Sequence, residues 1–381
     1  MVKKTDFVRS VAEGLDADGI LAFSDAIQEA DTSAPSFEYY QLNEQLAEAV
    51  GAHANTDTKL DLVHRLASRS WDGSPSPDAQ FTSEIIQSLH GADAQSAFNS
   101  LSESQLESVI DASTIKNALG ARVFFGEPGL DTPEGRMADF NGIMQAAASI
   151  NGAEDLKAEV FRLGTERLEA GPINRVHGGD LDPYRVGGLQ GLSNLLTSDA
   201  DKIIGALSNT PISADDTHLR DFAAMSIRHN QLDALNQVTA ALTLQTTPAE
   251  AWTNGVGFVD NEMGVRGFFA ASVVNGINDE QSWREIRTKI AGEIFDAAAS
   301  FAPGPSSKLL KLGYNEARDQ IRSAFTQAAE NAGQATDLNG LRDAFYIALG
   351  PLDANNAPAY GGSALAAFNS SFDAALIHTA Q

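Results

Sequence analysis

Apolar residues recur every three or four positions along most of the sequence, whereas the strict alternation of a half-buried strand is nearly absent. The clearest apolar stripe consists of Trp283, Ile286, Ile290, Ile294, Ala297 and Phe301. Pro303-Gly304-Pro305 ends this segment, because proline cannot continue a helix. Further helices are expected at 216–244, 307–331, 337–349 and 363–378. The sequence therefore predicts an all-α fold.

A possible internal duplication in the first two thirds of the chain decides how these helices group. Val63-His64-Arg65-Leu66-Ala67 and Val160-Phe161-Arg162-Leu163-Gly164 are similar, and a second block around Leu101–Ala112 is matched at nearly the same offset by Leu195–Ala206. Both copies of this second block have a serine three positions before a polar residue, as in a capping box. The pairs are Ser102 with Gln105 and Ser198 with Asp201. Chance similarity between amphipathic helices is the competing explanation.

The duplication predicts a tandem pair of related helical subdomains followed by a C-terminal helical bundle. The first subdomain covers 1–130 with its repeated core at 46–112, and the second covers 131–245 with its core at 143–206 and a long helix at 216–244. The third segment, 246–381, opens with a glycine-punctuated stretch at 252–276. Because small residues let helices approach closely, this stretch is expected to form a tightly packed hairpin, with a hinge or a membrane-inserting segment as alternatives.

Charge excludes several classes of partner. The chain has 51 Asp and Glu against 26 Lys and Arg, a formal net charge of -25, which repels nucleic-acid phosphates and anionic lipid headgroups. No cluster of Lys and Arg forms a local exception. The sequence therefore predicts a protein partner, basic or neutral, and no nucleic acid.

Cysteine is absent, which excludes disulfides, thiolate metal sites and a cysteine nucleophile. The first residues lack the unbroken apolar stretch of a signal peptide, and no run approaches the roughly 18 apolar residues of a membrane span. We therefore expect no stable membrane span, and a protein that is cytoplasmic or is exported without a cleavable signal peptide.

The loop at 174–185 holds the best local candidates for chemistry. His177, Asp180 and Asp182 could ligate a divalent cation or act as a His-carboxylate acid-base pair. Gly178-Gly179 would let the backbone approach a ligand closely. The competing interpretation is a structural turn, because Gly-Gly and Asp-Pro are common turn formers. Apart from this divalent cation, no cofactor is predicted.

Two other groups of polar residues favour structural roles. His218 and His229 are expected on one face of the helix at 216–244, but no third metal ligand is visible near them. Leu15-Asp16-Ala17-Asp18-Gly19 lacks the later ligands and the closing glutamate of a calcium loop, so it indicates the start of a helix. Nucleophile-elbow, phosphate-loop and zinc-protease motifs are missing.

The Gly- and Phe-rich stretch, followed by amphipathic helices and the Pro-Gly-Pro break, resembles helical delivery or pre-toxin regions of secreted bacterial proteins. This resemblance implies export. The first hypothesis is therefore a non-enzymatic bacterial interaction or scaffold protein, an exported effector or an accessory to one, that binds a protein partner through an acidic surface. The alternatives are a metal-dependent or His/Asp hydrolase with His177, Asp180 and Asp182 at its site, and a structural component of a larger particle. The sequence leaves the oligomeric state open.

Overall fold

The computed structural model describes residues 4–33, 37–71, 76–118, 137–171, 182–209, 218–229, 231–244, 256–278, 342, 345, 346, 349 and 363–377. Every regular element in these ranges is an α-helix and none is a strand, which confirms the all-α fold. The chain divides into two compact units, Met1–Leu195 and Leu196–Gln381. The three expected segments and the duplication of 46–112 in 143–206 remain predictions.

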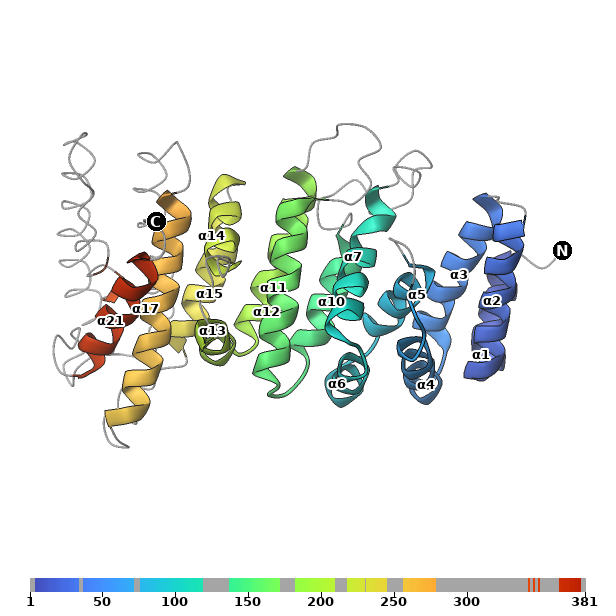
Figure 1. Ribbon diagram of the computed structural model, residues 1–381, viewed down its shortest axis with the longest axis horizontal. Helices are drawn as coiled ribbons and strands as arrows, with labels where there is room; N and C mark the ends of the chain where they lie inside the picture. Colours follow the sequence, from blue (N-terminus) through green and yellow to red (C-terminus); the bar gives the residue numbers. More distant parts are fainter. Residues whose placement is uncertain are drawn as a thin grey trace, which may run out of the picture. The chain divides into compact units, whose positions relative to one another are not determined.

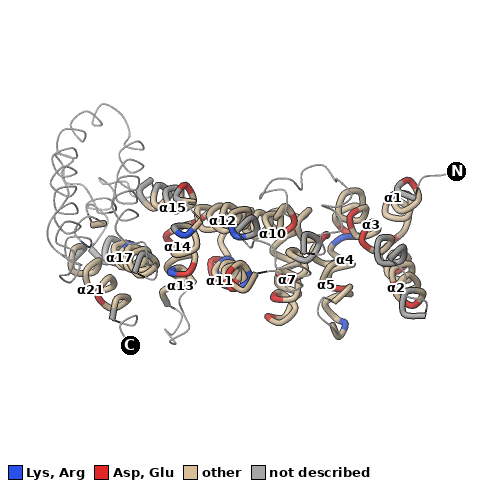
Figure 2. Tube along the Cα trace, turned by 90° about the horizontal axis from the view of Figure 1, so that it is seen from above, with Lys and Arg blue, Asp and Glu red and all other residues tan. Residues whose placement is uncertain are grey.

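The N-terminal unit is a series of helices that follow one another in chain order (Figure 1). Its helices are α1 (Lys4–Gly14), α2 (Ala17–Ser33), α3 (Phe37–His53), α4 (Thr56–Ala67), α5 (Pro77–Ile86), α6 (Gly91–Asn99), α7 (Glu103–Ala118), α10 (Ala138–Ala148), α11 (Glu154–Ala170) and α12 (Asp182–Thr197). Seen from above, α1, α3, α10 and α12 lie on one side of this unit and α2, α5, α7 and α11 on the other (Figure 2). Successive helices thereby bury their apolar stripes against their neighbours.

Helix α5 lies at the centre of this unit, in contact with α3, α4, α6, α7 and α10. Every residue from Phe81 to Ile86 is buried, polar ones included. Helix α3 comes close to α5, since a Cβ atom at Gly51 would lie 2.6 Å from the backbone oxygen of Glu84. Contacts with several helices thus bury the polar as well as the apolar residues of this part of α5.

Local capping residues set where several helices begin. The Asp16 carboxylate accepts a hydrogen bond from the Gly19 backbone N–H at 2.9 Å, which confirms the helix start expected there. Ser102 and Gln105 form the expected reciprocal capping box: each side chain accepts a hydrogen bond from the other residue's backbone N–H, at 3.0 and 3.3 Å.

The C-terminal unit contains α13 (Ala200–Asn209), α14 (His218–Arg228), α15 (Leu232–Leu244), α17 (Val256–Asn278) and α21 (Ser363–Ile377). The last of these confirms the helix expected at 363–378. Arg342, Phe345, Tyr346 and Leu349 are helical too. The stripe from Trp283 to Phe301 and the helix expected at 307–331 lie outside the described residues.

The prediction of a single long helix at 216–244 is wrong, because α14 ends at Arg228 and a separate helix, α15, begins at Leu232. The Gln231 backbone N–H donates to the Ser226 carbonyl at 2.7 Å, and the His229 N–H donates to Met225 at 3.0 Å. This pairing closes the end of a helix by turning the chain away from its axis. Helix α15 therefore packs back against α14 instead of extending it.

From Val256 on, the glycine-punctuated stretch forms one continuous helix, α17, and not the expected hairpin. Its glycines mark close approaches to other helices, as expected of a packing role. A Cβ atom at Gly267 would collide with the Phe368 carbonyl oxygen on α21, and one at Gly276 would lie 2.8 Å from the Ala224 backbone nitrogen on α14. Glycine thus places α17 in direct backbone contact with both neighbours.

Candidate functional site

The predicted loop site stays a prediction. His177 and Asp180 lie outside the described residues, and Asp182 begins α12 without a described side chain. Neither the cation site nor the acid-base pair is therefore tested.

The two described ends of that loop are held together by arginines. From the first turn of α12, Arg185 donates to the Leu168 carbonyl at 3.3 Å and to the Glu169 carbonyl at 2.9 Å. Arg167 donates to the Gly171 carbonyl at 3.1 Å. These carbonyls belong to the last turn of α11 and the residue after it, whose acceptors no helical N–H satisfies. The end of α11 and the start of α12 therefore lie next to each other.

The histidine pair His218 and His229 does not lie on one helix. His218 is the first residue of α14, and His229 follows its last residue. Within the described ranges, no group of three His, Asp or Glu side chains could hold a metal ion. The same ranges contain no helix long and apolar enough to cross a membrane.

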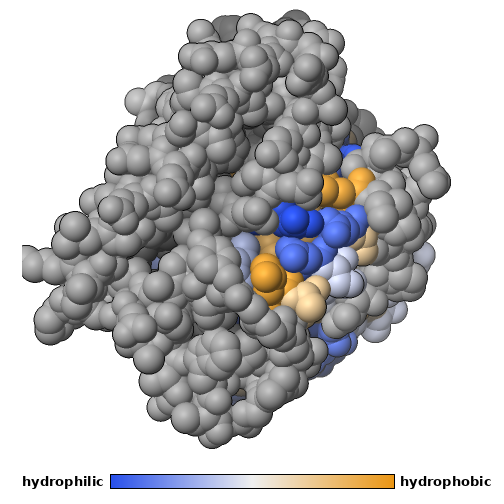
Figure 3. Space-filling model, turned by 90° about the vertical axis from the view of Figure 1, so that its left-hand side faces the viewer, coloured by the Kyte–Doolittle hydropathy of each residue, from blue (hydrophilic) through white to orange (hydrophobic). Residues whose placement is uncertain are grey.

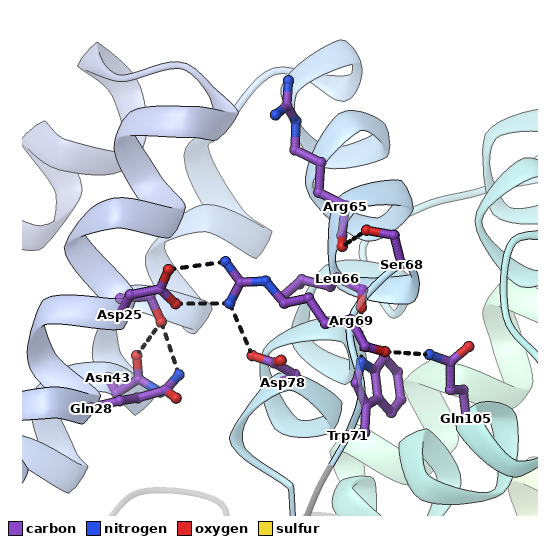
Figure 4. A network of polar contacts seen from close by, with 11 residues as sticks. Asp25, Gln28, Asn43, Arg65, Leu66, Ser68, Arg69, Trp71, Asp78 and Gln105 are labelled. Atoms are coloured by element: carbon purple, nitrogen blue, oxygen red, sulfur yellow. Dashed lines mark hydrogen bonds and ion pairs between the residues drawn. The ribbon is translucent and has the colours of Figure 1, made fainter. Parts of the chain in front are cut away.

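The described residues do contain a polar network that joins helices α2, α4, α5 and α7 of the N-terminal unit (Figure 4). Arg69, in the turn after α4, donates to both carboxylate oxygens of Asp25 on α2, at 2.7 and 3.0 Å. The same guanidinium lies 3.7 Å from Asp78 on α5. A bidentate arginine pair fixes direction as well as distance, so Arg69 orients α2 relative to the end of α4.

Two further side chains complete the network around the end of α4. The Trp71 indole nitrogen donates to the Leu66 carbonyl at 2.8 Å. From α7, the Gln105 amide donates to the Ala67 carbonyl at 2.9 Å. Both carbonyls belong to the last turn of α4, and the Leu66 carbonyl also accepts from the Arg69 backbone N–H at 2.9 Å. The network is thus a cap for α4 built by its neighbours.

Burial raises the pKa of the Asp78 carboxyl, and the attraction of Arg69 only partly offsets that rise. The raised pKa means that folded Asp78 keeps a proton at a pH where the unfolded chain has lost it. The contribution of Asp78 to the free energy of unfolding therefore falls with rising pH. The fall begins near pH 4, the pKa of Asp78 in the unfolded chain, and ends above its pKa in the folded protein.

We expect this pH dependence to disappear in Asp78→Asn. Urea unfolding of both proteins between about pH 3.5 and 7 should show that the stability of the wild type relative to the variant declines across that interval and then levels off. A relative stability that climbs with pH would mean that the ion pair with Arg69 dominates over burial.

Arginines also join α7 to α11. Arg162 on α11 lies 3.1 Å from Glu103 on α7 and 2.9 Å from Glu166 one turn along its own helix. Arg167 forms an ion pair with Asp111 on α7, and both of these side chains are largely buried. Because partly exposed pairs contribute about 1 kcal/mol or less, these contacts favour correct pairing more than high stability.

In the C-terminal unit a fully buried arginine joins three segments. Arg266 on α17 has an exposed fraction of 0%, and its Nη1 donates to the Leu349 carbonyl at 2.6 Å. Its Nε lies 3.6 Å from the Asp201 carboxylate on α13. Burial raises the pKa of Asp201 while Arg266 opposes the rise. Asp201, expected from the sequence in a capping box, thus faces a buried cation.

One Ser-His contact bears on the hydrolase alternative. Ser96 Oγ lies 3.5 Å from His64 Nε2 near the protein surface. A nucleophile and its base normally approach within about 3.2 Å, so this contact gives the hydrolase no support.

No model of a protein family matches the chain, and no curated protein is significantly similar to it. Function is therefore inferred from the residues of this chain. Sequence reasoning missed the Arg69 network and the Arg266–Asp201 pair, because an arginine's partner on a distant helix leaves no local pattern.

Proposed function

We propose that the protein is a non-enzymatic interaction or scaffold protein that binds a basic protein partner through the acidic surface of its helices. The observation that carries this proposal is the way the N-terminal unit uses its basic residues. In the whole chain, 51 acidic residues stand against 26 basic ones. What matters for binding is which charges remain available to a partner.

Every arginine whose side chain is described in the N-terminal unit contacts a carboxylate or a backbone carbonyl of the same chain. These arginines are Arg9, Arg65, Arg69, Arg162, Arg167 and Arg185. Lys59 and Lys157, the lysines of that unit whose side chains are described, are buried. The basic side chains that the structure describes in this unit are thus paired within the chain or buried.

Several carboxylates, in contrast, are exposed and form no ion pair within the described residues. They are Asp6, Asp16, Asp57, Asp93, Glu107, Asp155 and Glu169. They come from α1, α4, α6, α7, α11 and the turn before α2, so the negative charge is spread over the unit (Figure 2). A surface of this kind favours association with a positively charged protein and disfavours phosphates.

The test is a capture experiment with the whole chain as bait in a bacterial lysate, using a variant that neutralises Asp6, Asp16, Glu107 and Asp155 as Asn or Gln. We expect a partner that binds the wild type at about 50 mM salt, is released at about 300 mM, and binds the neutralised variant at least tenfold less.

The matched control keeps the charge by exchanging Asp for Glu and Glu for Asp at the same four positions, and it should bind like the wild type. Equal capture by the neutralised variant would contradict the proposal. So would a partner whose binding is insensitive to salt.

A further inference from the structure

Among the described residues, two large apolar side chains are exposed: Phe7 on α1 and Leu15 directly after this helix. Phe7 is 48% exposed and Leu15 is 43% exposed. Phe7, Val11 and Leu15 are spaced by four residues, so they form one stripe along α1 and its end. Val8 and Ala12, on the adjacent face, are buried in the core.

This stripe faces α2. The Phe7 ring meets the Phe23 ring edge-on with centroids 5.7 Å apart. At the other end of the stripe, a Cβ atom on Gly19 would lie 3.1 Å from the Leu15 Cβ. Both α1 and α2 pack on α3. We call the surface formed by Phe7, Val11, Leu15, Gly19 and Phe23 the α1–α2 seam.

The charges around the seam restrict what can cover it. Between residues 6 and 30, one basic residue stands against six acidic ones, namely Asp6, Glu13, Asp16, Asp18, Asp25 and Glu29. The basic residue, Arg9, is paired with Glu13 at 2.7 Å. Asp6 and Asp16 are exposed and form no ion pair within the described residues.

A second copy of the chain would bring the same acidic border against this one, and like charges across an interface are unfavourable. An anionic membrane is disfavoured for the same reason. A helix whose apolar stripe is flanked by Lys and Arg fits both the apolar seam and its acidic border. On the face drawn in Figure 3, by comparison, hydrophilic residues interrupt the hydrophobic ones.

We propose that the α1–α2 seam is the docking surface for a basic amphipathic helix of a partner protein. This inference rests on the proposed function, because it specifies where and how the acidic surface binds. Phe7 and Leu15 insert between the partner's apolar side chains, while Asp6 and Asp16 pair with its flanking cations.

The test measures binding of a fluorescein-labelled peptide by the whole chain in a fluorescence anisotropy titration. The peptide has about 18 residues, leucine at helical spacing and lysine elsewhere, which is long enough to form a helix. Phe7→Ser combined with Leu15→Ser should weaken binding about tenfold, the factor expected for two half-exposed apolar side chains. A peptide with glutamate in place of lysine should not bind.

A second variant tests the acidic border without changing the packing of Phe7. Asp6→Asn with Asp16→Asn should weaken binding at low salt and leave it unchanged at about 300 mM salt. The asparagine at 16 can still cap α2. Asp57→Asn with Asp93→Asn removes the same charge elsewhere and should bind like the wild type.

Three outcomes would overturn the proposal. The first is an unchanged affinity of Phe7→Ser, Leu15→Ser when circular dichroism shows this variant to be folded. The second is a wild-type dimer in sedimentation that this variant loses, which would assign the seam to a second copy. Binding to phosphatidylcholine vesicles that depends on Phe7 and Leu15 would assign it to lipid. If the variant still captures the salt-sensitive partner, the proposed function stands and only the seam is excluded.

Discussion

Asp201→Asn should lower the free energy of unfolding of the C-terminal unit by about 3–5 kcal/mol, the range for removing one partner of a buried ion pair. Arg266 has no exposed surface, and an arginine stays charged under all ordinary conditions. Its Nε and Nη2 have no hydrogen-bond partner within the described residues. The guanidinium thus depends on the charge of Asp201, 3.6 Å away, and on the Leu349 carbonyl. An asparagine amide cannot replace that charge.

The opposite substitution, Arg266→Met, should cost less and should depend on pH. Burial already raises the pKa of Asp201, and losing the cation raises it further. The carboxyl can therefore become neutral by binding a proton, which a guanidinium cannot do by losing one. With a folded pKa above the unfolded value, stability of this variant declines as pH rises through the folded value.

Urea unfolding at several pH values, with hydrogen exchange to localise the loss, checks both results. Protection should fall in α13 and α17 and stay unchanged in α4 and α5, which belong to the other unit. The double variant Asp201→Asn, Arg266→Met removes both charges and should recover part of the loss of Asp201→Asn. A loss below about 1 kcal/mol for Asp201→Asn would show that the buried cation is compensated in another way.

The sequence predicted those features that depend on residues close together in the chain. Apolar spacing indicated helices, Ser102 and Gln105 indicated a capping box, and Asp16 indicated a helix start. Each of these needs only one helical turn to be recognised. The break between α14 and α15 was missed because the sequence there contains neither proline nor glycine, and Asn230, a residue type that also ends helices, was overlooked.

Features that join distant segments could not be predicted in the same way. Arg266 and its partner Asp201 lie on different helices, so no local pattern indicates this pair. The exposure of Phe7 and Leu15 depends on how α1 and α2 sit on α3, which periodicity alone does not fix. The candidate loop at 174–185 lies mostly outside the described residues, so the cation site and the acid-base pair remain predictions from the sequence.

Gly267→Ala should destabilise the C-terminal unit by about 2–3 kcal/mol, as expected when a packed interface must accept an extra methyl group. The new Cβ would collide with the Phe368 carbonyl oxygen and lie 3.0 Å from its carbonyl carbon. Backbone cannot rotate away as a side chain can, so α21 has to shift. Phe368 is buried and its ring meets Tyr346 edge-on at 5.3 Å, so a shift disturbs that packing too.

Gly264→Ala on the same helix is the matched control. Its Cβ would meet only the Ser371 side-chain oxygen, at 3.2 Å, and a serine hydroxyl can change rotamer. Alanine is favoured over glycine in a helix by about 1 kcal/mol, so this variant should be neutral or slightly more stable. Thermal unfolding of both variants would separate the two effects. Equal stability of the two would mean that α17 and α21 do not approach as closely as Gly267 and Phe368 indicate, and that the glycines of α17 serve another purpose than packing.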